Sequence, residues 1–142
     1  MKKLYIQVLV PLLAALPLAL PAQDFDGSSP FLCATTEVME CVPVAGCQRI
    51  NAAVVEAPRF IKVDVANNTL SSRFANGDRT SAIQHHDTVD NKLMLQGVED
   101  GRETERDGIG WTLAVAQDSG DMVLTVSGDT VGFVIFGTCT HL

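Results

Sequence analysis

The four cysteines are the residues whose chemistry the sequence defines best. Cys33, Cys41 and Cys47 lie close together near the start of the chain, and Cys139 lies near its end. They form no C-x-x-C pair, so their spacing does not favour a zinc site, a redox-active pair or a c-type haem. In an exported chain, an even number of cysteines at irregular spacing favours two disulfides.

Two disulfides allow three connectivities, of which we favour one. The segment VPVAG between Cys41 and Cys47 contains a proline and a glycine and can turn tightly. This pair leaves Cys33 to bond with Cys139. The second bond would tie the start of the exported chain to its last strand.

His85, His86 and Asp87 form a second group of side chains suited to catalysis or metal binding. In a strand, neighbouring side chains point to opposite faces, so His85 and Asp87 share a face that His86 does not. Two ligands are too few for a metal site unless His141 or another carboxylate joins them. The serines lie outside any G-x-S-x-G motif, and no phosphate-binding glycine loop is present. We therefore expect no catalytic residue, no metal and no cofactor.

The charged segment VEDGRETERDGIG is the best candidate for a binding surface. Residues 99–108 carry five acidic residues against two arginines, a net charge of −3. Long charged loops on β scaffolds are common binding sites, although a solvated loop without a partner is the alternative. The residues expected to contribute to binding are Glu99, Asp100, Arg102, Glu103, Glu105, Arg106 and Asp107.

Residues 1–22 have the pattern of a secretory signal peptide. Lys2 and Lys3 precede an apolar run, and Ala22 offers a small residue at the cleavage point. Prolines interrupt the run, which argues against a membrane-spanning helix. We expect a mature protein in the periplasm or secreted, without stable membrane insertion after cleavage.

The charge balance restricts the partners of the mature protein. The full chain has a net charge of −7, and removal of two lysines with the signal gives −7 − 2 = −9. This sign argues against nucleic acid and anionic lipid surfaces as partners. It is compatible with a basic protein partner in the cell envelope.

The exported chain is predicted to consist of an N-terminal segment, residues 23–47, and an antiparallel β domain, residues 48–142. Connections of mostly two to five residues favour a meander of about eight strands. We expect a closed or nearly closed barrel, with a sandwich as the alternative. Residues 34–41 are a candidate short helix. The expected strands lie at residues 48–56, 59–65, 69–74, 79–88, 92–98, 109–116, 122–126 and 130–139.

Bulky side chains at alternating positions are expected to fill the barrel. These residues are Ile61, Val63, Val65, Leu93, Leu95, Trp111, Leu113, Val115, Leu124, Phe133 and Ile135. A filled interior favours a module that binds at its surface. A lipocalin-like carrier of a small apolar ligand is the alternative, and it would need a cavity of about 300 Å³ or more.

The layout is similar to that of the small periplasmic lysozyme inhibitors. The similarity rests on the signal peptide, a compact antiparallel barrel, the F-x-C entry at Phe31 to Cys33 and a cysteine close to the C-terminus. Those inhibitors carry a serine-glycine loop followed by a tyrosine, whereas the nearest stretch here is SSRFANGD. The similarity is architectural and carries over no functional residue. We expect a non-catalytic, macromolecule-binding or inhibitor-like module, with the apolar carrier and a small hydrolase as alternatives.

Overall fold

A computed structural model describes residues 24–74, 77–101 and 107–142, and these residues form an all-β protein. They contain ten strands and no helix, and so none that could cross a membrane. The strands are β1 (Phe31–Val42), β2 (Gly46–Ile50), β3 (Phe60–Asp64), β4 (Thr69–Phe74), β5 (Gly77–Ala82), β6 (His85–Val89), β7 (Lys92–Glu99), β8 (Ile109–Ala116), β9 (Asp121–Ser127) and β10 (Gly132–His141).

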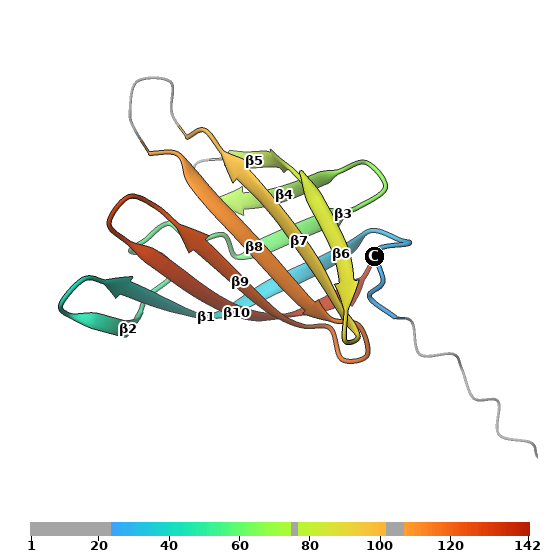
Figure 1. The fold of residues 1–142 in the computed structure, drawn as a ribbon, viewed down its shortest axis with the longest axis horizontal. Helices are drawn as coiled ribbons and strands as arrows, with labels where there is room; N and C mark the ends of the chain where they lie inside the picture. Colours follow the sequence, from blue (N-terminus) through green and yellow to red (C-terminus); the bar gives the residue numbers. More distant parts are fainter. Residues whose placement is uncertain (1–23, 75–76, 102–106) are drawn as a thin grey trace, which may run out of the picture.

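All ten strands belong to one antiparallel sheet (Figure 1). Nine of them follow the order β5-β4-β3-β1-β10-β9-β8-β7-β6, and β2 pairs with β1 outside this path. One edge of β1 pairs with β10 along most of its length, while its other edge pairs first with β3 and then with β2. The first and last strands therefore lie together at the centre of the sheet.

Short turns with left-handed residues set the register of two hairpins. Asp90 and Asn91 both have positive φ, 47° and 60°, and connect β6 to β7 as a two-residue turn. Between β3 and β4, Asn68 has a φ of 52°. Asn67 donates its backbone N–H and side-chain amide to the Asp64 carboxylate at 3.1 and 2.8 Å, which lowers the pKa of Asp64. Asparagine and aspartate tolerate this geometry better than most residues, so the local sequence specifies both turns.

The sheet curls so that β3, β4 and β5 lie behind β7, β8 and β9 in the view of Figure 1. One hydrophobic core fills the concave side. Of the side chains predicted to point inward, Val65 and Phe133 are half-buried. The others are buried, as predicted: Ile61, Val63, Leu93, Leu95, Trp111, Leu113, Val115, Leu124 and Ile135.

Phe25 closes one end of this core from the segment before β1. Its side chain is buried, lies edge-on to Phe31 with ring centroids 5.5 Å apart, and stacks on His141 at 4.3 Å. Its backbone N–H donates to the carbonyl oxygen of Gln117 in the turn between β8 and β9. The segment before β1 is therefore part of the packing.

Gly97 on β7 permits the close approach of the indole of Trp111, its partner on β8. A Cβ at Gly97 would lie 2.4 Å from Trp111 Cζ2 and 2.4 Å from the carbonyl oxygen of Ala82. Real atoms do not approach so closely, so a larger residue would displace the indole or the β5 backbone. The absence of a side chain at this position is what lets β5 pack against β7.

The prediction of a closed or nearly closed barrel is not supported, because the sheet stays open between its edge strands β5 and β6. The chain changes partner between these strands: Ile83 N–H donates to Asn68 O beside β4, and Gln84 N–H donates to Gln96 O on β7. The two bonds thus continue the β4–β5 ladder and the β6–β7 ladder, which lie at opposite ends of the strand order. They bring β5 close to β7 at one point, and beyond it side chains join these two strands.

The predicted helix at residues 34–41 is also wrong, because these residues belong to β1. Ladders on both sides satisfy the backbone of this strand, and Cys33 and Val38 point into the core. Such pairing overrides a local helix preference. The strand predicted at residues 48–56 ends at Ile50, and the one at residues 79–88 is split into β5 and β6 by the change of partner.

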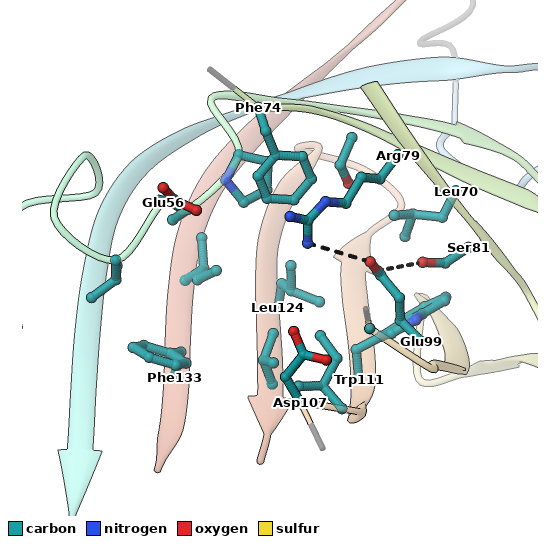
Figure 2. A pocket seen from close by; sticks show the side chains of 18 residues that line it. Glu56, Leu70, Phe74, Arg79, Ser81, Glu99, Asp107, Trp111, Leu124 and Phe133 are labelled. Carbon is teal, nitrogen blue, oxygen red and sulfur yellow. Dashed lines mark hydrogen bonds and ion pairs between the residues drawn. The ribbon is translucent and has the colours of Figure 1, made fainter. Parts of the chain in front are cut away.

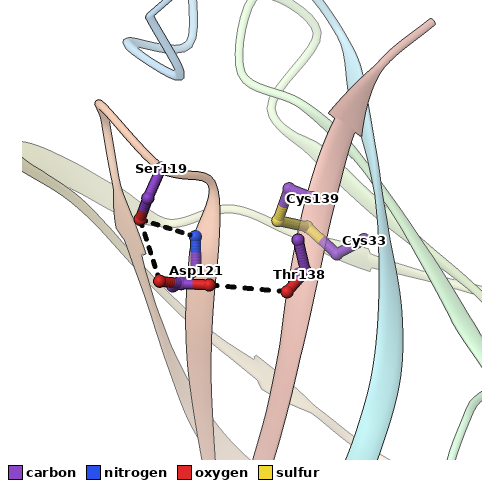
Figure 3. Close-up of a disulfide and its surroundings, with 5 residues drawn as sticks. All are labelled: Cys33, Ser119, Asp121, Thr138 and Cys139. Carbon is purple, nitrogen blue, oxygen red and sulfur yellow. Dashed lines mark hydrogen bonds between the residues drawn. A yellow bond between two sulfur atoms is a disulfide. The ribbon is translucent and has the colours of Figure 1, made fainter.

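Both predicted disulfides are confirmed. Cys33 bonds with Cys139 across the β1–β10 pair, and Cys41 bonds with Cys47 across β1 and β2. Figure 3 shows the first bond beside Asp121, whose carboxylate accepts from Ser119 Oγ at 3.0 Å. Two intramolecular disulfides indicate an oxidising, extracytoplasmic environment. The predicted signal peptide itself lies outside the described residues.

Candidate functional site

The predicted acidic surface is only partly within the described residues. Glu99 ends β7, Asp100 and Gly101 follow it, and Asp107 precedes β8. The predicted residues Arg102, Glu103, Glu105 and Arg106 lie outside the described residues. Two of the described acids, Glu99 and Asp107, line a pocket at the end of the curled sheet where β7 ends and β8 begins. We call this the open end of the curled sheet.

This pocket lies on the concave side of the sheet, between the β4–β5 wall and the β8–β10 wall (Figure 2). It has a volume of about 220 Å³. Residues 55–58, in the connection between β2 and β3, complete its lining. The apolar side chains that line it are Val55, Ala57, Pro58, Leu70, Phe74, Ile109, Trp111, Leu124, Val126, Phe133 and Ile135.

A polar network crosses the gap between β5 and β7 on one side of the pocket. Ser81 Oγ donates to Glu99 Oε2 at 2.8 Å, and Arg79 Nη1 lies 3.7 Å from Glu99 Oε1. The Arg79 guanidinium also lies over the ring of Phe74, 4.7 Å from its centroid, a cation–π arrangement. In Figure 2 the side chains of Arg79 and Ser81 both point toward the Glu99 carboxylate. These contacts join β5 to β7, two strands that share no backbone ladder.

The β4–β5 wall is further fixed by an ion pair outside the pocket. Arg73 donates Nε and Nη2 to the two carboxylate oxygens of Asp78 at 3.0 and 3.1 Å. This paired hydrogen bonding lowers the pKa of Asp78 and raises that of Arg73. Both side chains are exposed, so the pair orients the hairpin more than it stabilises the fold.

Two further carboxylates flank the pocket. Asp107 lies against Gly101, since a Cβ on Gly101 would overlap the Asp107 carboxylate. Glu56 lines the pocket from the β2–β3 connection and is one of the few non-glycine residues with positive φ, 51°. Backbone in this region is unfavourable for a side chain such as glutamate and is often found at binding sites. With Glu99 and Arg79, the described residues that line the pocket include three carboxylates and one guanidinium, a net charge of −2.

Trp111 contributes an unusual polar atom to the pocket lining. Among the described residues, its indole Nε1 is the one buried side-chain nitrogen or oxygen with no hydrogen-bond partner. A buried donor left unpaired costs about 1–3 kcal/mol. Trp111 is also the single tryptophan of the chain, so all tryptophan fluorescence of the protein comes from a side chain that lines this pocket.

The histidines are not brought together. His85 and His86 lie exposed on the edge strand β6, and Asp87 beside them accepts a hydrogen bond from the backbone of Thr88. His141 stacks on Phe25 at the end of β10. Within the described ranges no three His, Cys, Asp or Glu residues are grouped to hold a metal ion, and the pocket lining includes none of the histidines.

Sequence reasoning missed Arg79, Ser81, Phe74 and Glu56 as site residues. Arg79 and Ser81 lie two positions apart in a strand, so their side chains share one face, and this spacing could have marked them as a pair. Nothing in the sequence places that face opposite Glu99, because the contact depends on how far the sheet curls. The position of Glu56 depends on a connection that was predicted to be a strand.

No family model, curated protein or solved structure matches this chain. A function for the protein therefore has to be argued from the geometry of the pocket and its surroundings.

Proposed function

We propose that this protein is a non-catalytic binding module of the cell envelope, periplasmic or secreted, that recognises another macromolecule at the open end of its curled sheet. The observation that carries the proposal is the pocket that joins an apolar lining to the acidic ends of the β7–β8 connection. Apolar contact area supplies affinity, and a few placed charges supply orientation and specificity.

The polar groups in the pocket support binding rather than catalysis. Ser81 is buried and donates a hydrogen bond to Glu99, and Glu99 is held by both Ser81 and Arg79. An ordinary carboxylate is a weak base for activating a serine, which usually needs a histidine at hydrogen-bond distance. The nearby groups therefore lack the base that a serine hydrolase requires. Their contacts instead fix the shape of the pocket.

A carrier of a small apolar ligand is the second candidate, because most of the pocket lining is apolar. The volume of about 220 Å³ lies below the roughly 300 Å³ that marks the lower end of small-molecule pockets. It suits one long side chain of a partner better than a whole carried molecule. We therefore place macromolecular recognition first.

The experiment is a pull-down from envelope extract with the purified protein and two variants of one loop. Ala57→Phe adds a ring at a half-buried position that lines the pocket, whereas Ala53→Phe adds the same ring at an exposed position outside it. We expect the wild type and Ala53→Phe to retain the same proteins and Ala57→Phe to lose them. Retention by all three would refute the pocket as the binding surface. An organic extract of the purified protein that releases one small apolar compound would instead establish the carrier.

A further inference from the structure

The pocket combines an apolar interior with a negative mouth, and this pairing restricts what can occupy it. Among the described lining residues, an anionic head group would meet three carboxylates and one guanidinium, and a purely apolar group would make no use of their charge. A ligand with an apolar stem and a cationic head satisfies both parts. Arginine and lysine side chains have this shape, since their methylene stems pack on apolar surface while the charge stays at the rim.

We propose, on the basis of the binding function above, that the pocket receives a single arginine side chain from a basic segment of the partner protein. The stem of this arginine lies along Val126 and Phe133, and its guanidinium binds Glu99. A protein with a net charge of −7 attracts such a segment over long range.

Glu99 has the capacity to accept this additional guanidinium. Its Oε2 takes the hydrogen bond from Ser81, but its Oε1 is 3.7 Å from Arg79, beyond the usual limit of about 3.2 Å for a hydrogen bond. The side chain of Glu99 is 24% exposed, so it is reachable from the mouth yet screened less than a surface carboxylate. Oε1 can therefore accept from an incoming donor without breaking the Ser81 contact.

Arg79 leaves room at this position, because its Nη1 stays 3.7 Å from Glu99 Oε1 while its guanidinium lies over the ring of Phe74. Glu56 and Asp107 also lie on the pocket lining and keep the mouth negative after Arg79 is counted. Arginine fits better than lysine, since its planar guanidinium is more weakly hydrated and can donate to more than one carboxylate oxygen. The pocket thus provides charge for the head and apolar surface for the stem.

The test uses capped synthetic peptides of one sequence, with glycines and serines around a central arginine, citrulline or norleucine. Citrulline keeps the shape of arginine without its charge, and norleucine keeps only the stem. Binding is followed by the fluorescence of Trp111, the single tryptophan of the chain and part of the pocket lining. We expect the arginine peptide to bind roughly tenfold or more tightly than the citrulline peptide, the range for a hydrogen bond to a charged group.

Two variants that each remove one negative charge show where the arginine peptide binds. Glu99→Gln removes the proposed acceptor charge, and Asp118→Asn removes an exposed charge in the β8–β9 turn, outside the pocket. Glu99→Gln should lower the affinity for the arginine peptide by roughly tenfold. Asp118→Asn should leave this affinity within about twofold of the wild-type value. Equal weakening by both variants would show that only overall charge matters and would overturn the arginine site.

The peptide test and the pull-down fail independently. Equal affinity for the arginine and citrulline peptides, or no fluorescence change with any peptide, would overturn the arginine inference. If Ala57→Phe still loses its captured proteins in that case, the binding function stands with a different anchor. Tight binding of the norleucine peptide alone would show that the pocket selects an apolar group.

Discussion

The two disulfides should differ in their contribution to stability, and the chain separation predicts by how much. Cross-linking reduces the conformational entropy of the unfolded chain by an amount that grows with the logarithm of the loop length. The Cys33–Cys139 separation of 106 residues gives about 4.8 kcal/mol at 25 °C, and the Cys41–Cys47 separation of 6 gives about 2.2 kcal/mol. Cys33 and Cys139 are also buried, so their removal loses core contacts as well.

The measurement is urea unfolding of the wild type and two double variants, Cys33→Ala/Cys139→Ala and Cys41→Ala/Cys47→Ala. The first should lose at least about 2.5 kcal/mol more of the free energy of unfolding than the second. The expectation is also met if Cys33→Ala/Cys139→Ala no longer folds while Cys41→Ala/Cys47→Ala still does. Reduced wild type serves as the control because it keeps the Cys33 and Cys139 side chains in the core without the bond between them. Equal losses, or a larger loss for the short loop, would refute the loop-length argument.

Three further predictions concern packing and charge. Gly97→Ala should destabilise the protein by about 1–3 kcal/mol or more in thermal unfolding, because the new Cβ has no room, while Gly110→Ala, with nothing within 4 Å of its Cβ, should change stability little. Phe25→Ala should lower the free energy of unfolding, measured in urea, by about 3–5 kcal/mol because a buried ring is removed. A loss below about 1 kcal/mol would contradict the packing of this segment. The hydrogen bonds from Asn67 depress the folded-state pKa of Asp64, so they stabilise the fold above the usual carboxyl pKa and this stabilisation is lost as the pH falls through the depressed value. The stability difference between the wild type and Asp64→Asn should therefore shrink on acidification, and a constant difference across the pH series would argue against it.

Local patterns in the sequence were sufficient for the features that depend on neighbouring residues. The tight VPVAG turn selected the Cys41–Cys47 bond, and with it the long bond from Cys33 to Cys139. Alternation of apolar side chains located β3, β7 and β8. These signals are local because a turn or a strand face is specified by residues a few positions apart.

Features that depend on distant pairing were not predictable in the same way. Residues 34–41 have no strong strand pattern, and they are extended because β10 and β2 supply partners for their backbone. The sheet stays open between β5 and β6 because the chain changes partner there, with Ile83 bonding beside β4 and Gln84 bonding to β7. Neither choice of partner is encoded in a short stretch of sequence.

The candidate site likewise contains residues that the local sequence indicated and residues that depend on distant pairing. Glu99 and Asp107 were expected in a binding surface because of their charge and loop context, and both lie at the pocket. Arg79 and Ser81 reach Glu99 only through the curl of the sheet.

The long disulfide also determines how the protein would respond to a mechanical force. If the chain were pulled by its two ends, tension would pass directly from Cys33 to Cys139 through the sulfur atoms. The strand pairs outside this bond are Phe31 with His141 and Leu32 with Thr140, and only these would unzip, together with the short terminal segments. Everything between the two cysteines would carry no load. A stretching experiment should therefore show almost no extension until the disulfide is reduced.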